Sequence, residues 1–190
     1  MSLPRIFGRK KDDKAAHALY LVLAGQARQP AFYRDGGVPD CLDGRFDMLA
    51  LHMILVLRRL SGKAASSAEI GLAQQLFDVM FGDMDRSLRE MGVGDLTVGK
   101  RIRTMSEAFY GRVAAYESGL QASDGDALLI GALERNLYRG ATPGGQILAR
   151  MAAYMHQVAA GLDNQTGEDL LAGRLSFPAP PAFDIDRELA

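Results

Sequence analysis

Residues 92–101 read GVGDLTVGKR, and within them Gly94, Gly99 and Lys100 have the spacing of a phosphate-binding loop. Such a loop needs a β-strand before its glycines and a Ser or Thr directly after its lysine. Here an amphipathic helical pattern precedes the glycines, and Arg101 stands where the hydroxyl should be. No later segment resembles a buried strand that ends in an acidic residue. We therefore interpret the stretch as a turn between two helices and expect no nucleotide to bind there.

The same residues are explained in full as a helix boundary. Gly92 and Gly94 permit the positive backbone φ that ends many helices, and Asp95 or Thr97 is expected to cap the next helix. Cations follow near the positive end of that helix, where they are mildly unfavourable; they are Lys100, Arg101 and Arg103. A local conflict of this kind sometimes marks a binding surface.

No other arrangement of residues predicts a reaction centre. His17, His52 and His156 fall on three different predicted helices, without a second metal ligand at helical spacing. His52 lies in an apolar helix, which is typical of a hydrogen-bonded core residue. Cys41 has no activating partner near it in the sequence, and no serine lies in a nucleophile elbow. We therefore expect a protein that is not an enzyme and uses no metal or cofactor.

Charge is instead concentrated beside the apolar runs. Asp40, Asp43, Arg45 and Asp47 crowd the start of the most apolar predicted helix. A carboxylate near a helix N-terminus stabilises the helix by about 0.3–1 kcal/mol, so capping alone can explain the group. Recognition of a partner is the alternative, and the sequence leaves both interpretations open.

A second charged group lies on the following helix. Asp83, Asp85, Arg86, Arg89 and Glu90 can form the pairs Asp85–Arg89, Arg86–Glu90 and Asp83–Arg86 at helical spacing. A solvated face with ion pairs is the ordinary interpretation. The chain also has nine methionines, which adapt to varied apolar partners. Together these features indicate an interaction protein without naming its partner.

Composition limits the function classes. The 190 residues are 48% hydrophobic and 24% charged, which suits one soluble domain with a substantial core. A net charge of -1 gives no general attraction to nucleic acid, and the single cysteine fits a reducing compartment. The longest apolar run, at 48–57, is half of the roughly 20 residues that span a bilayer. We expect a cytoplasmic, at most membrane-proximal protein whose short basic N-terminus makes at most weak membrane contact.

The elements that must position these residues are helical almost throughout, because apolar residues recur every three or four positions. The pattern predicts an all-α, single-domain bundle of about six to seven helices with short flexible termini. The predicted helices cover roughly 12–29, 43–60, 66–91, 96–116, 124–140, 142–162 and a short one from 166, with an irregular connector at 33–40. We divide the chain into a flexible basic N-terminal tail (1–11), a helical domain (12–174) and an extended Pro-rich C-terminal tail (175–190).

Three stretches have an unusual wording. They read GVPDCLDGRFDM at 37–48, LFDVMFGDMDRSLREMGVGDLTVGK at 76–100 and MSEAFYGR at 105–112. In this wording the chain resembles the ubiquinol–cytochrome c chaperone family, over roughly residues 12–170.

The resemblance implies an all-helical, non-enzymatic assembly factor. Mitochondrial members help to make the respiratory ubiquinol–cytochrome c reductase. They act with a small partner protein near the ribosomal tunnel exit and hold newly made cytochrome b. This chain has no evident targeting presequence, so we expect a bacterial member, to which the roles of the ribosome and the partner protein do not transfer directly. The positions expected to contact a partner are Asp40, Asp43, Arg45, Asp47, Asp83, Asp85, Arg86, Arg89, Glu90, Asp95, Lys100, Arg101 and Tyr110.

Our leading hypothesis is therefore a chaperone that shields a nascent apolar client, such as cytochrome b. Phe77, Phe81, Met84 and Tyr110 are expected to supply an adaptable apolar groove. The alternative hypothesis is a helical adaptor or peripheral membrane-binding module with no chaperone activity, suggested by the basic N-terminus and the Pro-rich C-terminal tail. If Asp43, Arg45, Asp83 and Arg86 converge on one groove, recognition is favoured; if they scatter, capping is enough.

Overall fold

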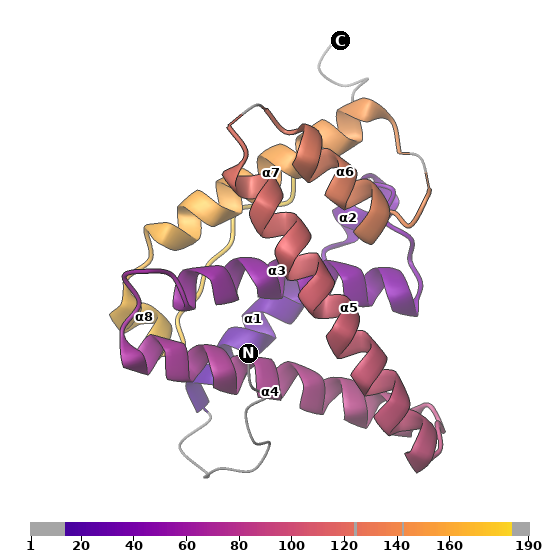
Figure 1. The fold of residues 1–190 in the computed structure, drawn as a ribbon, viewed down its shortest axis with the longest axis vertical. Coiled ribbons are helices and arrows are strands. Elements are labelled where there is room, and N and C mark those ends of the chain that lie inside the picture. The colour runs from indigo at the N-terminus through magenta and orange to yellow at the C-terminus, as the bar shows by residue number, and fades with distance from the viewer. Residues whose placement is uncertain (1–13, 124, 142, 184–190) are drawn as a thin grey trace.

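A computed structural model describes residues 14–123, 125–141 and 143–183, and every regular element in these ranges is an α-helix (Figure 1). The helices are α1 (Lys14–Ala27), α2 (Pro30–Arg34), α3 (Leu42–Leu60), α4 (Ser67–Glu90), α5 (Asp95–Gln121), α6 (Ala127–Asn136), α7 (Gly145–Asp163) and α8 (Gly167–Leu171). The all-α prediction is confirmed, and the seven predicted helices are all present. The additional helix, α2, begins at Pro30, because proline is tolerated in the first turn of a helix.

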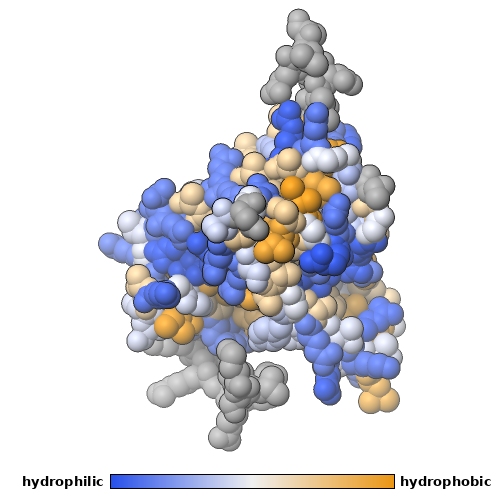
Figure 2. Space-filling view, turned by 45° about the horizontal axis from the view of Figure 1, so that its top comes forward, coloured by the Kyte–Doolittle hydropathy of each residue, from blue (hydrophilic) through white to orange (hydrophobic). Residues whose placement is uncertain are grey.

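The centre of the fold is α3. Its apolar residues point to all sides, so it is buried along most of its length. Helices α1, α4, α5 and α7 all pack against it. In Figure 1, α4 runs beside α3, α5 crosses in front of both helices, and α1 lies behind them. Figure 2 shows another face of the molecule, where hydrophilic residues surround a smaller central area of hydrophobic ones.

Side chains cap the N-termini of two helices. At α4, Ser66 Oγ accepts a hydrogen bond from the Glu69 backbone N–H at 3.3 Å, and the Glu69 carboxylate accepts one from the Ser66 N–H at 2.8 Å. At α8, Thr166 accepts from the Asp169 N–H at 3.1 Å. These contacts, which are reciprocal at α4, satisfy backbone donors that a helix start leaves unpaired.

Other helix starts differ from the prediction. At α3 the capping group is the sulfur of Cys41, which accepts from the Gly44 N–H at 3.5 Å, and none of the nearby aspartates caps the helix. No side chain caps α5, and α7 begins at Gly145, later than the helix predicted from 142. Residue 124, where the preceding helix was predicted to begin, lies outside the described residues.

The GVGDLTVGKR stretch joins α4 to α5, so helices flank it on both sides. Gly92 has a φ of 80°, the left-handed conformation that ends α4. Gly94 is instead the extended residue before α5, with a φ of -65°. Met91, the residue before Gly92, is 54% exposed. The turn interpretation is confirmed, and the expectation for Gly94 was wrong.

The chain after α8 follows the helical body without regular structure as far as residue 183. The Gln26 side chain donates to the Pro178 carbonyl at 2.9 Å, and Arg150 donates to the Ala182 carbonyl at 2.7 Å. Phe183 is 5% exposed and packs edge-on against Phe32. This part of the C-terminal segment therefore contributes to the core. The tail predicted at 1–11 and the residues beyond 183 lie outside the described part.

Candidate functional site

A groove of about 1160 Å³ opens between the C-terminal half of α3, the N-terminal half of α4 and the second half of α5. Apolar side chains from all three helices line it: Ile54, Leu57, Ile70, Ala73, Phe77, Phe109, Tyr110 and Val113. Two of these are unusually exposed for large apolar groups, Ile70 at 52% and Tyr110 at 56%. A site that leaves such side chains open to solvent is suited to contact with an apolar partner.

Aromatic rings form one wall of the groove and continue beyond it. The ring centroids of Phe77 and Phe109 lie 5.6 Å apart, and those of Phe77 and Tyr110 lie 6.0 Å apart. Phe81 extends the cluster along α4, 4.6 Å from Phe77. Phe109 is buried, Phe77 and Phe81 are half-buried, and Tyr110 is exposed. The cluster therefore presents aromatic surface from a base that is fixed in the core.

An ion pair with its hydrogen bonds lies at one end of the groove. Arg59 binds the Glu69 carboxylate at 2.9 Å and also donates to the Gln165 carbonyl at 2.9 Å. Hydrogen bonds from the Ser66 backbone and hydroxyl, and then from Arg59, lower the pKa of Glu69 to about 2. Glu69 therefore stays ionised near neutral pH, and the network ties the start of α4 to the segment between α7 and α8.

A second, smaller cavity of about 440 Å³ lies at the other end of the fold. It is lined by Arg28, Pro30, Tyr33, Arg34, Asp40 and Arg45. Arg45 binds Asp40 through its Nε at 2.7 Å. Asp40 and Arg45, which the sequence assigned to a partner site, thus pair with each other on the rim of this cavity.

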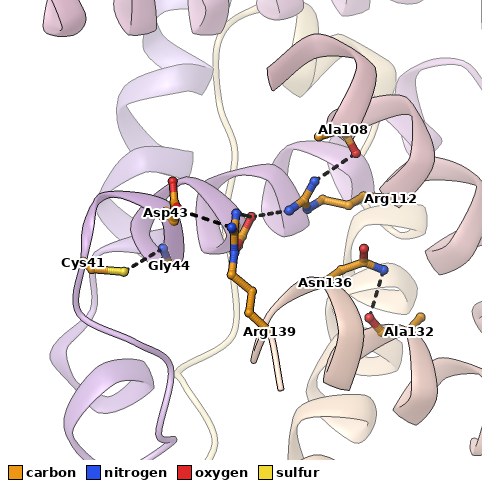
Figure 3. Close-up of polar contacts among 9 residues, drawn as sticks. Cys41, Asp43, Gly44, Ala108, Arg112, Ala132, Asn136 and Arg139 are labelled. Atoms are coloured by element: carbon orange, nitrogen blue, oxygen red, sulfur yellow. Dashed lines mark hydrogen bonds and ion pairs between the residues drawn. The ribbon is translucent and has the colours of Figure 1, made fainter. Parts of the chain in front are cut away.

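Asp47 lies in the core rather than on the surface. It is 0% exposed, and its carboxylate accepts hydrogen bonds from Arg112 at 2.7 Å and from Arg139. Figure 3 shows the side chains of Arg112 and Arg139 approaching this part of α3 from opposite sides, with Asp43 beside Arg139 at 3.2 Å. Burial raises the pKa of the Asp47 carboxyl, and the two arginines oppose that rise. This position leaves Asp47 no surface to offer a partner.

The charged residues predicted on α4 are mostly satisfied locally. Asp85 binds Arg89 at 2.6 Å, as predicted, and Arg89 also binds Asp95. Asp83 accepts a hydrogen bond from the Tyr20 hydroxyl at 2.6 Å. Its ion pair with Arg86 is long, at 4.0 Å. These contacts give the residues a structural role, whether or not a partner also binds them.

Three predicted positions are exposed and form no ion pair with a described residue: Glu90, Lys100 and Arg101. The predicted pair between Arg86 and Glu90 is therefore absent from the described part of the chain. Met84 is half-buried on α4, beyond Phe81.

Four charged residues were expected to show, by converging or not, whether they recognise a partner. They do not line a common groove; they are Asp43, Arg45, Asp83 and Arg86. Asp43 faces Arg139, and Arg45 borders the smaller cavity. Asp83 and Arg86 lie beside Tyr20 of α1. Of the predicted positions, only Phe77 and Tyr110 line the large groove. Local pairing thus accounts for these four residues.

Most residues of the groove were not predicted from the sequence. Its α4 wall is the stripe Ile70, Ala73 and Phe77, and its α5 wall is the stripe Tyr110, Val113, Glu117 and Gln121. Both stripes have the three- and four-residue spacing of one helix face. The spacing of Ile70 and Phe77, which places both on one face of α4, was the signal in the sequence that could have indicated this wall. Periodicity does not show that the two stripes face each other.

The histidine predicted to lie in the core does so. His52 is 0% exposed; its Nδ1 is 2.9 Å from the Met48 carbonyl and its Nε2 is 2.8 Å from the Tyr154 hydroxyl. Within the described ranges, no group of His, Cys, Asp and Glu side chains is placed to hold a metal ion. None of the helices described is both long enough and apolar enough to cross a membrane.

Comparison with known proteins gives consistent matches. The sequence pattern of the ubiquinol–cytochrome C chaperone family matches residues 34–177. The ubiquinol–cytochrome-c reductase complex assembly factor 1 of Xenopus laevis is 26% identical over 168 residues, which cover 88% of this chain and 82% of that protein. The Drosophila melanogaster assembly factor is also 26% identical, over 78% of this chain but only 58% of its own length. The crystal structure of the Cbp3 homolog from Brucella abortus superposes with a TM-score of 0.77 at 37% identity, over 88% of this chain and 90% of that one.

Proposed function

Because the chain belongs to the ubiquinol–cytochrome c chaperone family, we propose that it helps to assemble ubiquinol–cytochrome c reductase by holding newly made cytochrome b. The family consists of assembly chaperones and not of enzymes. The identity of the client goes beyond what the family match shows. The resemblance and the apolar lining of the groove support cytochrome b.

The observation that carries the proposal is the groove between α3, α4 and α5. A membrane subunit has segments of roughly 20 apolar residues that need shielding before lipid is available. An amphipathic or apolar helix binds such a groove through side chains spaced three and four residues apart. The groove volume of about 1160 Å³ exceeds the roughly 300–1,000 Å³ of a small-molecule site. One or two turns of a client helix are therefore a more suitable occupant than a metabolite.

The charged residues at the ends of the groove are expected to orient the client more than to increase its affinity. Arg59 and Glu69 neutralise each other, and Arg58 pairs with Asp163 at 3.4 Å. Paired charges at a rim contribute more to specificity than to affinity. A chaperone must release its client, so an apolar wall with a polar rim suits this task.

Site-specific photo-crosslinking tests the proposal. Tyr110 and Leu128 are both 56% exposed, but only Tyr110 lines the groove. With a photoreactive residue at position 110, we expect irradiation of growing cells to link the protein to cytochrome b. The same residue at position 128 is expected to give no such product. Equal crosslinking at both positions, or recovery of unrelated soluble proteins alone, would contradict the client assignment.

A binding variant provides the complementary measurement. Tyr110→Asp places a charge on the aromatic wall and is expected to weaken cytochrome b binding about 30-fold or more, as loss of a central aromatic contact does. Leu128→Asp is the control of equal exposure. Because both side chains are exposed, thermal unfolding of the two variants should match that of the unmodified protein. A helical adaptor without chaperone activity would retain its partners in both variants.

A further inference from the structure

Helix α1 presents a basic and apolar stripe to solvent. Lys14, His17, Leu21, Gly25 and Arg28 follow one another at three- and four-residue spacing and are all exposed. Leu21 is 72% exposed, and the neighbouring Val22 is 39% exposed. The helix contains no acidic residue. Its outer face therefore combines open apolar surface with cations at both ends.

The stripe continues into the smaller cavity, because Arg28 belongs to both. Arg28 forms no ion pair with a described residue. Arg45, across the cavity, donates to Asp40 through Nε. Its two terminal nitrogens form no hydrogen bond with a described residue, so they can bind another acceptor. Burial raises the pKa of Tyr33 to about 12, and the positive charges of Arg45 and Arg28 oppose that rise. Both cations thus lie within electrostatic range of the same tyrosine.

This surface faces away from the client groove. In Figure 1, α1 lies behind α3 and α4, whereas α5, which forms one wall of the groove, lies in front of them. No residue of α1 lines either cavity, and Arg28, which directly follows α1, lines only the smaller one. A partner on the α1 side would leave the groove accessible.

We propose that the surface formed by Lys14, Leu21, Val22, Arg28 and Arg45, here called the α1 face, docks on a bilayer that contains anionic phospholipid. Leu21 and Val22 enter the headgroup layer, and the guanidinium groups of Arg28 and Arg45 bind lipid phosphates. Guanidinium pairs with phosphate through parallel N–H donors, and its weak hydration favours such an interface. The face is small, so binding is reversible.

The exposed apolar side chains of Leu21 and Val22, next to the cations, favour lipid over an acidic protein as the partner. A protein partner would place its own acids opposite the cations but would leave Leu21 and Val22 to be covered separately. An anionic bilayer provides both a plane of phosphates and an apolar layer beneath it. Asp40, which lines the cavity, is already paired with Arg45, and Asp35 is paired with the neighbouring Arg34.

Co-sedimentation of the full chain with vesicles tests the proposal. We expect binding to vesicles of phosphatidylcholine with phosphatidylglycerol and little binding to phosphatidylcholine alone. Each cation near an anionic surface strengthens binding about fivefold, so Arg28→Glu, a change of two charges, should weaken binding about 25-fold. Leu21→Asp should weaken it more than about tenfold, because it replaces an inserted apolar group with an anion. Circular dichroism is expected to show unchanged folding, since both side chains are exposed.

The matched controls are Arg101→Glu and Leu128→Asp, which change an exposed cation on α5 and an exposed leucine on α6. Both should bind the anionic vesicles as the unmodified protein does. Equal loss in the variants and the controls would overturn the proposal, as would equal binding to both kinds of vesicle. Complete competition by inorganic phosphate would assign the cavity to a free anion. Arg28-dependent binding to a polyglutamate peptide but not to vesicles would replace lipid with an acidic protein.

Discussion

Replacing Asp47 with asparagine is expected to lower the free energy of unfolding by about 3–5 kcal/mol, because it removes the carboxylate that pairs with the buried Arg112. The Arg112 side chain is 9% exposed, so water cannot replace the lost partner. Asparagine keeps the size of the side chain and one acceptor oxygen. The change in the free energy of unfolding therefore reports mainly the loss of the negative charge. Chemical denaturation with the same probe for both proteins measures the difference.

Asp43→Asn is the matched control. Asp43 contacts Arg139, which also binds Asp47, but its side chain is 67% exposed. Exposed ion pairs contribute about 0–1 kcal/mol to the free energy of unfolding. A further variant, Asp47→Leu with Arg112→Met, removes both charges and should recover much of the loss, because a buried ion pair is often no more stable than apolar groups of similar size. A loss below about 1 kcal/mol for Asp47→Asn would show that Arg112 is solvated in the protein.

This ion-pair group also bears on the client groove. Arg112 lies on α5 two residues beyond Tyr110, and Asp47 lies on α3, so their contact fixes the two helices against each other. Arg112 also donates to the Ala108 carbonyl of its own helix at 2.9 Å. Loss of the pair is therefore expected to alter the groove as well as the stability. Asp47 itself, which is fully buried, therefore contributes to the packing of these helices.

Acidification between about pH 6.5 and pH 4 is expected to destabilise the protein through His52. Burial lowers the pKa of His52 to about 4 in the folded chain, against about 6.5 when it is unfolded. Between these values the unfolded chain takes up a proton at this site and the folded chain does not. The free energy of unfolding therefore falls as the pH falls, by about 3 kcal/mol over the whole window.

The hydrogen bonds explain why the folded chain excludes that proton. The Met48 carbonyl can only accept, so Nδ1 of His52 donates to it, and Nε2 accepts from the Tyr154 hydroxyl. Tyr154 in turn accepts from Gln26, whose amide also holds the Pro178 carbonyl. A proton on Nε2 would oppose the Tyr154 donor. It would disturb the contacts that keep the C-terminal segment on the helical body.

His52→Gln provides the comparison for this prediction. The amide keeps hydrogen-bonding groups at the site but does not titrate, so the variant should lose less stability than the unmodified protein over this range of pH. Denaturation at a series of pH values measures both slopes, and the contributions of the other histidines cancel in their difference. Parallel curves would mean that His52 already carries its proton in the fold.

Local patterns in the sequence were sufficient to predict where the helices lie. Apolar spacing and the pairs at Ser66 and Thr166 act within a few residues, so they define helices and two of their starts without knowledge of the fold. The same reasoning rejected the phosphate loop, because its requirements for a strand and a hydroxyl are also local. Predictions from local spacing failed where several side chains could cap the same helix. At α3, Cys41 rather than an aspartate supplies the N-terminal cap.

The sequence by itself determined the all-helical fold, the family and the rejection of a nucleotide site, because each depends on residues close together in the chain. Only the tertiary structure decided which charges are buried and which stripes form the groove. Asp47 meets Arg112 and Arg139 across 65 and 92 positions of the chain. Tyr110 and Phe77 likewise come together only when α5 crosses α4. Helical periodicity fixes the face on which a side chain lies, but the packing of helices fixes what that face meets.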